Sequence, residues 1–230
     1  MTPEEVRDVA LTSLALAVSS AALIAIDLAG GKKQDVPVMN LVWPLTALYA
    51  GPFAVLAYFW FGSASRASRN MVRSRPSLFP KPPMWQRTVL GAAQCGAGCA
   101  LGGLLLGGEL FHLDNAPVPA TATLAFYVLG SVVAFVLGIG FQYFTLQPKR
   151  AQSTRTRLWA AFKGDALSVL AFQVGACTWM AVCSKLIFDS SLEANDLVFW
   201  FMMQLSMIIG LIISYPMNWM LVKQGIKKAT

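Results

Sequence analysis

The sequence has little charge and few of the residues that metal centres and hydrolytic sites require. Only 13% of its 230 residues are Asp, Glu, Lys or Arg, whereas a soluble domain carries about 25%. The single histidine, His112, excludes a bis-histidine haem site and most histidine-based metal centres within one chain. The four cysteines lack CxxC spacing, and no HExxH, GxSxG, P-loop or GxGxxG signature occurs in a fitting context. No reaction is therefore indicated by a motif.

Long apolar runs are what the chain has in abundance, because 56% of its residues are hydrophobic. A spanning helix needs about 20 apolar residues to cross about 30 Å of hydrocarbon. Six segments have this length, and they lie at residues 9–28, 39–61, 88–108, 122–145, 163–187 and 197–221. We therefore expect an all-α bundle of six transmembrane helices that forms one integral membrane domain over residues 1–230.

Basic residues fall mainly on one side of these segments. Fifteen of the 18 Lys and Arg residues lie at Arg7, between the second and third segments, between the fourth and fifth, at the start of the fifth, or after the sixth. Only Lys32, Lys33 and Lys185 lie on the opposite side. The positive-inside rule then predicts two cytoplasmic termini, in a bacterial inner membrane. The acidic residues around Arg7 run against this orientation.

The formal net charge of +7 is spread over the predicted cytoplasmic connections. In those positions it fixes the topology of the chain and meets anionic lipid head groups. Nucleic-acid binding also uses basic residues, but here the pattern follows the spans. We therefore expect the lipid bilayer, and no nucleic acid, as a partner.

The third segment carries small residues and cysteines at four-residue spacing. Gly91, Cys95, Cys99, Gly103 and Gly107 share one helix face, which we call the small-residue stripe. One interpretation is close helix packing, within the chain, in a homo-oligomer or against a membrane-complex partner. The other is a soft-metal site, since two cysteine sulfurs on one face suit copper or zinc. Both interpretations stay open, with Cys95 and Cys99 as the predicted metal ligands.

Polar side chains inside the predicted spans are candidates for a pocket. Asp165 lies about a turn inside the fifth segment, and an ionisable residue within a membrane is by default a hypothesis of function. The alternative is that Asp165 caps its helix or pairs with Lys163 or Arg157. Ordinary interhelical hydrogen bonds explain the amides equally well. The predicted pocket consists of the two thiols, Asp165, and the amides Gln94, Gln173, Gln204 and Asn218.

Several short motifs occur in order along the chain. They are Asn40-Leu-Val-Trp43-Pro44 continuing to Pro52, Cys95-Gly-Ala-Gly98-Cys99, Asp165-Ala-Leu-Ser168 with Phe172-Gln173, Met203-Gln204, and Tyr215-Pro216 with Asn218-Trp219. The set resembles an uncharacterised membrane family, domain of unknown function 4396, over roughly residues 38–228. The resemblance implies a compact multi-helix membrane domain with a cysteine-bearing third helix and no established activity. In that family histidine usually stands where this chain has Gln94, and an acidic residue often stands at Gly103, so this copy departs from a His-Cys-Cys-acid cluster.

Three functions are compatible with these features. The first is a small-solute or soft-metal permease in which thiols and amides bind the solute and Asp165 compensates its charge. The second is an integral membrane enzyme for a lipid-soluble substrate, with Asp165 as acid or base. The third is an accessory subunit that packs against a partner through the small-residue stripe. We favour the permease. Structural features would distinguish the three. Convergent buried polar groups would favour the permease, and a lateral opening that contains Asp165 would favour the enzyme. A small-residue stripe that faces outward would favour the accessory subunit.

Overall fold

The computed structural model describes residues 3–31, 34, 36–62, 82–113, 120–146, 153–187 and 196–227. These residues are helical, without strands, in agreement with the all-α prediction. The elements are α1 (Pro3–Ala29), α2 (Met39–Ala50), α3 (Pro52–Ala57), the π-helical turn η1 (Tyr58–Gly62), α5 (Met84–Leu113), α6 (Ala120–Thr145), α7 (Thr154–Val182), the π-helical turn η3 (Cys183–Ile187) and α8 (Leu197–Lys223).

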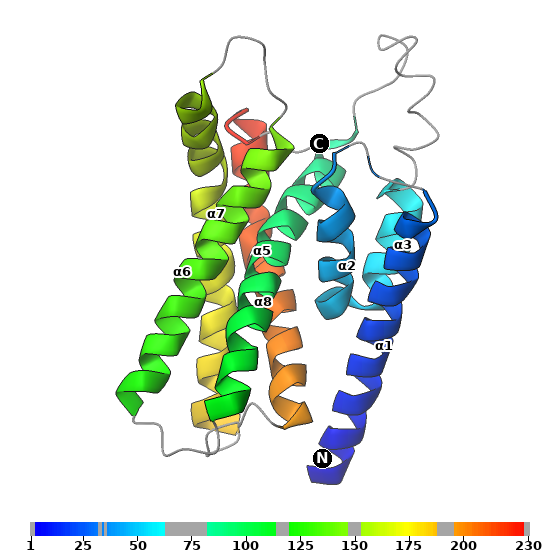
Figure 1. The fold of residues 1–230 in the computed structure, drawn as a ribbon, viewed down its shortest axis with the longest axis vertical. Coiled ribbons are helices and arrows are strands. Elements are labelled where there is room, and N and C mark those ends of the chain that lie inside the picture. Colours follow the sequence, from blue (N-terminus) through cyan, green and yellow to red (C-terminus); the bar gives the residue numbers. More distant parts are fainter. Residues whose placement is uncertain are drawn as a thin grey trace.

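Within the described ranges, five helices are long and apolar enough to cross a bilayer. The candidate spans are Glu4–Ala29, Met84–Leu105, Val128–Thr145, Thr154–Ile187 and Leu197–Lys223. Figure 1 shows α5, α6, α7 and α8 running up and down side by side, with α1 along one side of the bundle. The apolar side chains that these helices leave exposed suit contact with lipid rather than water.

The predicted span over residues 39–61 is not a single helix. α2 ends at Ala50, Gly51 adopts φ 54° and ψ −133°, and α3 begins at Pro52. Proline has no N–H to continue α2, and glycine tolerates a positive φ, so the sequence Gly51-Pro52 breaks the helix. With 12 residues, α2 is about 18 Å long and cannot cross the hydrocarbon core. The prediction of a spanning helix at 39–61 is therefore wrong.

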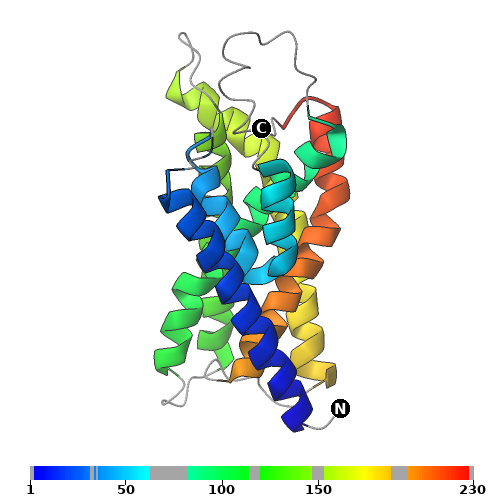
Figure 2. The same cartoon turned by 90° about the vertical axis from the view of Figure 1, so that its right-hand side faces the viewer.

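The broken segment enters and leaves at the same end of the bundle. α2 runs inward from the end where α1 finishes, and α3 turns back toward that end (Figures 1 and 2). The start of α1 and the end of α8 lie at opposite ends of the bundle in Figure 1. The prediction that both termini lie on one side of a membrane is therefore not confirmed by the arrangement of α1 and α8 (Figure 1).

Small residues allow α5 to lie at the centre of the bundle. A methyl group added at Gly98 would lie 2.6 Å from the Gly138 nitrogen of α6. One added at Gly103 would lie 2.9 Å from the Met203 methyl carbon of α8. Cys95 and Cys99 are buried between these contacts. The small-residue stripe therefore packs inside the chain from Gly91 to Gly103, and does not form an outer face there.

Candidate functional site

The segment that follows α8 turns back into the bundle. Gly225 has φ 70°, and its N–H donates to Val222 O at 3.1 Å, while the Ile226 N–H donates to Leu221 O at 3.0 Å. This pair of bonds with a left-handed glycine is a Schellman motif, which reverses the chain at a helix C-terminus. The reversal places the side chain of Lys227 between α5, α7 and α8.

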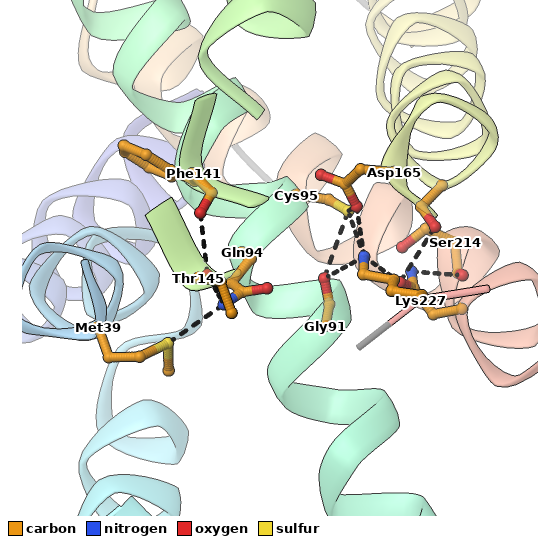
Figure 3. A network of polar contacts seen from close by, with 11 residues as sticks. Met39, Gly91, Gln94, Cys95, Phe141, Thr145, Asp165, Ser214 and Lys227 are labelled. Atoms are coloured by element: carbon orange, nitrogen blue, oxygen red, sulfur yellow. Dashed lines mark hydrogen bonds and ion pairs between the residues drawn. The ribbon is translucent and has the colours of Figure 1, made fainter. Parts of the chain in front are cut away.

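The Lys227 ammonium lies among four acceptor groups, which we call the ammonium cage. It forms an ion pair with Asp165 Oδ1 on α7, and both side chains are fully buried. It also donates to Gly91 O on α5 at 2.9 Å and to Asn218 Oδ1 on α8 at 2.6 Å, and lies 3.4 Å from Cys95 Sγ (Figure 3). Three helices thus contribute to one cation-binding position inside the bundle.

A second layer of hydrogen bonds orients the cage. The Cys95 thiol donates to Asp165 Oδ1 at 3.1 Å. Ser168 donates to Asn218 Oδ1 at 3.1 Å, and Asn218 Nδ2 donates to Ser214 O at 2.9 Å. These bonds fix the Asn218 amide with its oxygen toward the cation. The other carboxylate oxygen, Asp165 Oδ2, is buried and has no hydrogen-bond partner among the described residues.

Two glycines make room for the lysine stem. A methyl group added at Gly91 would lie 3.1 Å from Lys227 Cε, and one at Gly164 would lie 3.3 Å from Ile226 O. Burial is the largest single influence on the pKa of Lys227 and lowers it, but the charges and hydrogen-bond acceptors of Asp165 and Cys95 together raise it by more, so the net shift is upward from 10.5. The ammonium form is therefore the stable form of this side chain at neutral pH.

Of the predicted metal ligands, only Cys95 belongs to the cage. Cys99 lies one turn further along α5 in a buried cluster with Tyr49, Val169 and Phe172. The described parts of the chain contain no group of three or more His, Cys, Asp or Glu side chains that could hold a metal ion. Copper or zinc at Cys95 and Cys99 stays a prediction.

The structure separates the predicted pocket amides. Asn218 is part of the cage, but Gln94 points to the other side of α5 (Figure 3). There its Nε2 donates to Thr145 Oγ1 at 2.8 Å and lies 3.5 Å from Met39 Sδ. Gln173 donates to Ser131 O at 2.6 Å. Gln94 and Gln173 thus join helices rather than line the cage.

Gln204 lies at the helix break. Its Nε2 donates to Leu48 O at 3.4 Å, and its Oε1 accepts from Ser13 Oγ at 2.8 Å. In an unbroken helix Leu48 O would accept from residue 52, but Pro52 has no N–H. Gln204 therefore supplies a donor that the break removes, and ties α2 to α8 and α1.

A shallow groove of about 450 Å³ lies between α6 and α7. Its lining is mostly apolar, with Ser131 and Gln173 as the polar side chains. The lining residues are Val128, Ser131, Val132, Phe135, Leu170, Gln173 and Cys177. Asp165 does not line this groove. The groove therefore lacks the carboxylate that the membrane-enzyme interpretation places in a lateral opening.

Sequence reasoning missed Lys227, which it assigned to a topology-determining cytoplasmic tail. A usable signal was present, since a glycine directly after a helix predicts a left-handed cap and a reversal of the chain. The depth reached by the side chain depends on Gly91 and Gly164, which come from distant parts of the sequence. Those contacts follow from the packing and not from a local pattern.

A family model described as domain of unknown function (DUF4396) matches residues 84–227. The matched range begins at the first residue of α5 and ends at Lys227, so it contains every member of the ammonium cage. No curated protein and no solved structure matches the chain.

Proposed function

The chain belongs to this family of unknown function, and we propose that it is a permease for a small cation with Asp165 as its ion-binding carboxylate. The observation that carries this proposal is the complete burial of the Asp165–Lys227 ion pair between α5, α7 and α8. Burying two charges takes several kcal/mol per ion of desolvation, and well-packed apolar residues are often as stable. A buried carboxylate that is held in an ion pair is well suited to exchange one cation for another.

The arrangement of acceptors supports a cationic solute. Besides Asp165, the cage presents the neutral oxygens of Gly91 and Asn218 and the sulfur of Cys95. Its only carboxylate carries one negative charge, which balances a monovalent cation. A divalent ion would leave a net positive charge in a low dielectric, which is unfavourable. We therefore expect monovalent cations to be preferred.

The helix break at Gly51 is consistent with transport. Non-helical backbone at membrane depth is tolerated where protein or a water-filled cavity covers it. Discontinuous helices are frequent at the binding sites of secondary transporters. Here the carbonyl freed by Pro52 is covered by Gln204 of α8, which is the helix that also supplies Asn218 to the cage.

The charge distribution orients the bundle. Among the described residues, those at the end where α8 finishes include Arg87, Arg155, Arg157, Lys163, Lys223 and Lys227, whereas Arg7 and Lys185 lie toward the opposite end (Figure 1). The opposite end contains the described acidic residues Glu4, Glu5, Asp8 and Asp196 (Figure 1). From the positive-inside rule we expect the basic end to face the cytoplasm and the acidic start of α1 to face the other side. A bacterial inner membrane stays part of this proposal.

Cys95 gives a specific reason to test soft metals beside other cations. A thiol within a cage of oxygens could contribute to Cu(I) or zinc binding once Lys227 is displaced. The assay therefore includes Cu(I) and zinc alongside sodium, potassium, ammonium and methylammonium.

The test is cation flux into proteoliposomes, with wild type compared to Asp165→Asn and Asp27→Asn. Asp27 is the matched control, because this carboxylate accepts a hydrogen bond from the Tyr58 hydroxyl at 2.7 Å and is not a member of the cage. We expect one monovalent cation to enter faster than into empty liposomes, and only Asp165→Asn to abolish this flux. Flux equal to that of empty liposomes for every cation, or unchanged flux in folded Asp165→Asn protein, would overturn the proposal.

A further inference from the structure

The group that occupies the cage is itself a primary ammonium on an apolar stem. A primary ammonium has three N–H donors, and the cage offers three oxygens, Gly91 O, Asp165 Oδ1 and Asn218 Oδ1, with Cys95 Sγ beside them. The stem passes Gly91, where an added methyl group would lie 3.1 Å from Lys227 Cε. The cage is therefore complementary in charge, donor number and width to a group of the type R–NH₃⁺.

The polypeptide that delivers this ammonium lies outside the spanning helices. Gln224, Gly225 and Ile226 are exposed, and the Ile226 and Lys227 amides both donate to the same acceptor, Leu221 O. The Gln224 and Gly225 amides donate to Met220 O and Val222 O, so these bonds tie the turn to the last turn of α8, and rotation of its backbone dihedrals would withdraw Lys227 without unfolding the rest of α8. The free energies of such local openings range from near zero to that of global unfolding, and helix ends lie toward the low end.

We infer that the ammonium cage is a binding site for free primary ammonium compounds, and that Lys227 is a tethered occupant that competes with them. Asp165 supplies the charge, Asn218 and Gly91 supply the directional acceptors, and Gly91 limits the width of the site. The assignment of these compounds as transported solutes rests on the proposed function, whereas their binding to the cage does not.

The test replaces the lysine side chain with a free molecule. Lys227→Ala deletes the atoms from Cγ to Nζ, which together correspond to propylammonium. The variant is purified in detergent, and its melting temperature is measured with increasing propylammonium chloride. We expect low stability without the amine and a rise in melting temperature with the logarithm of its concentration, because the ligand binds the folded state.

Three controls separate the cage from general salt effects. Tetramethylammonium has the same charge but no N–H donor, so it should not stabilise Lys227→Ala. The double variant Asp165→Asn, Lys227→Ala has lost the carboxylate, so propylammonium should not shift its melting temperature. Lys223→Ala removes an exposed lysine of α8 and should respond as wild type does. Equal shifts with both cations, or a shift in the double variant, would overturn the inference.

A measurement on wild type covers the case in which Lys227→Ala does not fold. Propylammonium should displace Lys227 and speed hydrogen exchange at the amides of Ile226 and Lys227, while amides in the middle of α8 stay protected. Unchanged exchange at the turn, together with no recovery of folded Lys227→Ala in propylammonium, would contradict the inference. Rescue without flux in proteoliposomes would overturn the permease and leave the binding site, and flux without rescue would do the reverse.

Discussion

Asp165 and Lys227 are 62 residues apart in the sequence, and yet their charged groups form a fully buried ion pair. Asp165 is the twelfth residue of α7, and Lys227 reaches it only because the chain reverses after α8. Loss of either partner would leave an uncompensated charge inside the bundle. The properties of this pair therefore give the most direct tests of the structure.

The first prediction concerns alkaline pH. The pKa of Lys227 is raised above 10.5, because Asp165 and Cys95 together outweigh the lowering effect of burial. A folded-state pKa above the unfolded value means that this stabilisation is complete below pH 10.5 and is lost as pH rises through the folded pKa. The melting temperature of wild type should therefore fall in strong alkali by more than that of Asp165→Asn, Lys227→Met.

Other groups around Lys227 define the controls for the pH measurement. Cys95 faces it from α5 and Asp165 from α7, whereas α8 contributes the uncharged Asn218. Cys95→Ser removes the thiol as a source of alkaline titration and leaves the Asp165–Lys227 ion pair in place, so the loss of stability in alkali should persist in this variant. Parallel alkaline profiles for wild type and the charge-free double variant would show that Lys227 is not paired in the folded state.

The second prediction concerns the contact between α5 and α6. A methyl group at Gly98 would lie 2.6 Å from the backbone nitrogen of Gly138, which cannot move aside as a flexible side chain can. Gly98→Ala should destabilise the protein by about 1–3 kcal/mol, as overpacking does. Gly140→Ala is the matched control, because nothing lies within 4 Å of its added methyl group. Equal stabilities of the two variants in detergent denaturation would argue against this helix contact.

The third prediction concerns the helix break. Gln204→Leu leaves Leu48 O without the donor that replaces the missing Pro52 N–H, at a cost of about 1 kcal/mol. Ser13→Ala removes the other contact of the same amide. A double-mutant cycle on unfolding should show that the two losses are not additive. Strict additivity would mean that the two side chains do not meet in the folded protein.

The fourth prediction concerns topology. Glu5 and Gln224 are exposed and lie near opposite ends of the bundle. Cysteines introduced at these positions should react with a membrane-impermeant maleimide from opposite sides of sealed vesicles, because five spans separate them. Labelling of the wild-type protein under the same conditions gives the background from the native cysteines. Labelling of both positions from the same side would restore a six-span topology.

Much of the fold could be predicted because apolar length and charge asymmetry are local properties of the sequence. The spans at residues 88–108, 163–187 and 197–221 overlap α5, α7 and α8 closely. Residues 39–61 were mispredicted because their composition fits a span, while two adjacent residues, Gly51 and Pro52, interrupt the helix. The acidic residues beside Arg7 are the sequence signal that agrees with the position of the start of α1 at the end of the bundle opposite the end of α8 (Figure 1).

The site was predicted in part. Asp165, Cys95 and Asn218 were named because polar residues inside apolar helices are conspicuous, and the structure brings these three together. Gln94 and Cys99 were grouped with them by proximity in sequence, but the helical turn places Gln94 on another face. Lys227 follows the last apolar segment instead of lying within it, so the sequence does not mark it as a site residue. Its role depends on the reversal at Gly225 and on the room beside Gly91.

The central claim is best tested by the energetic coupling between Asp165 and Lys227. The free energy of unfolding is measured for wild type, Asp165→Asn, Lys227→Met and the double variant, with Lys223→Met as the exposed-lysine control. Each single change at the pair should lower stability by about 3 kcal/mol, and the double variant should recover most of that loss. Additive losses in the double variant, or a Lys227→Met variant as stable as Lys223→Met, would contradict a buried cation site at Asp165.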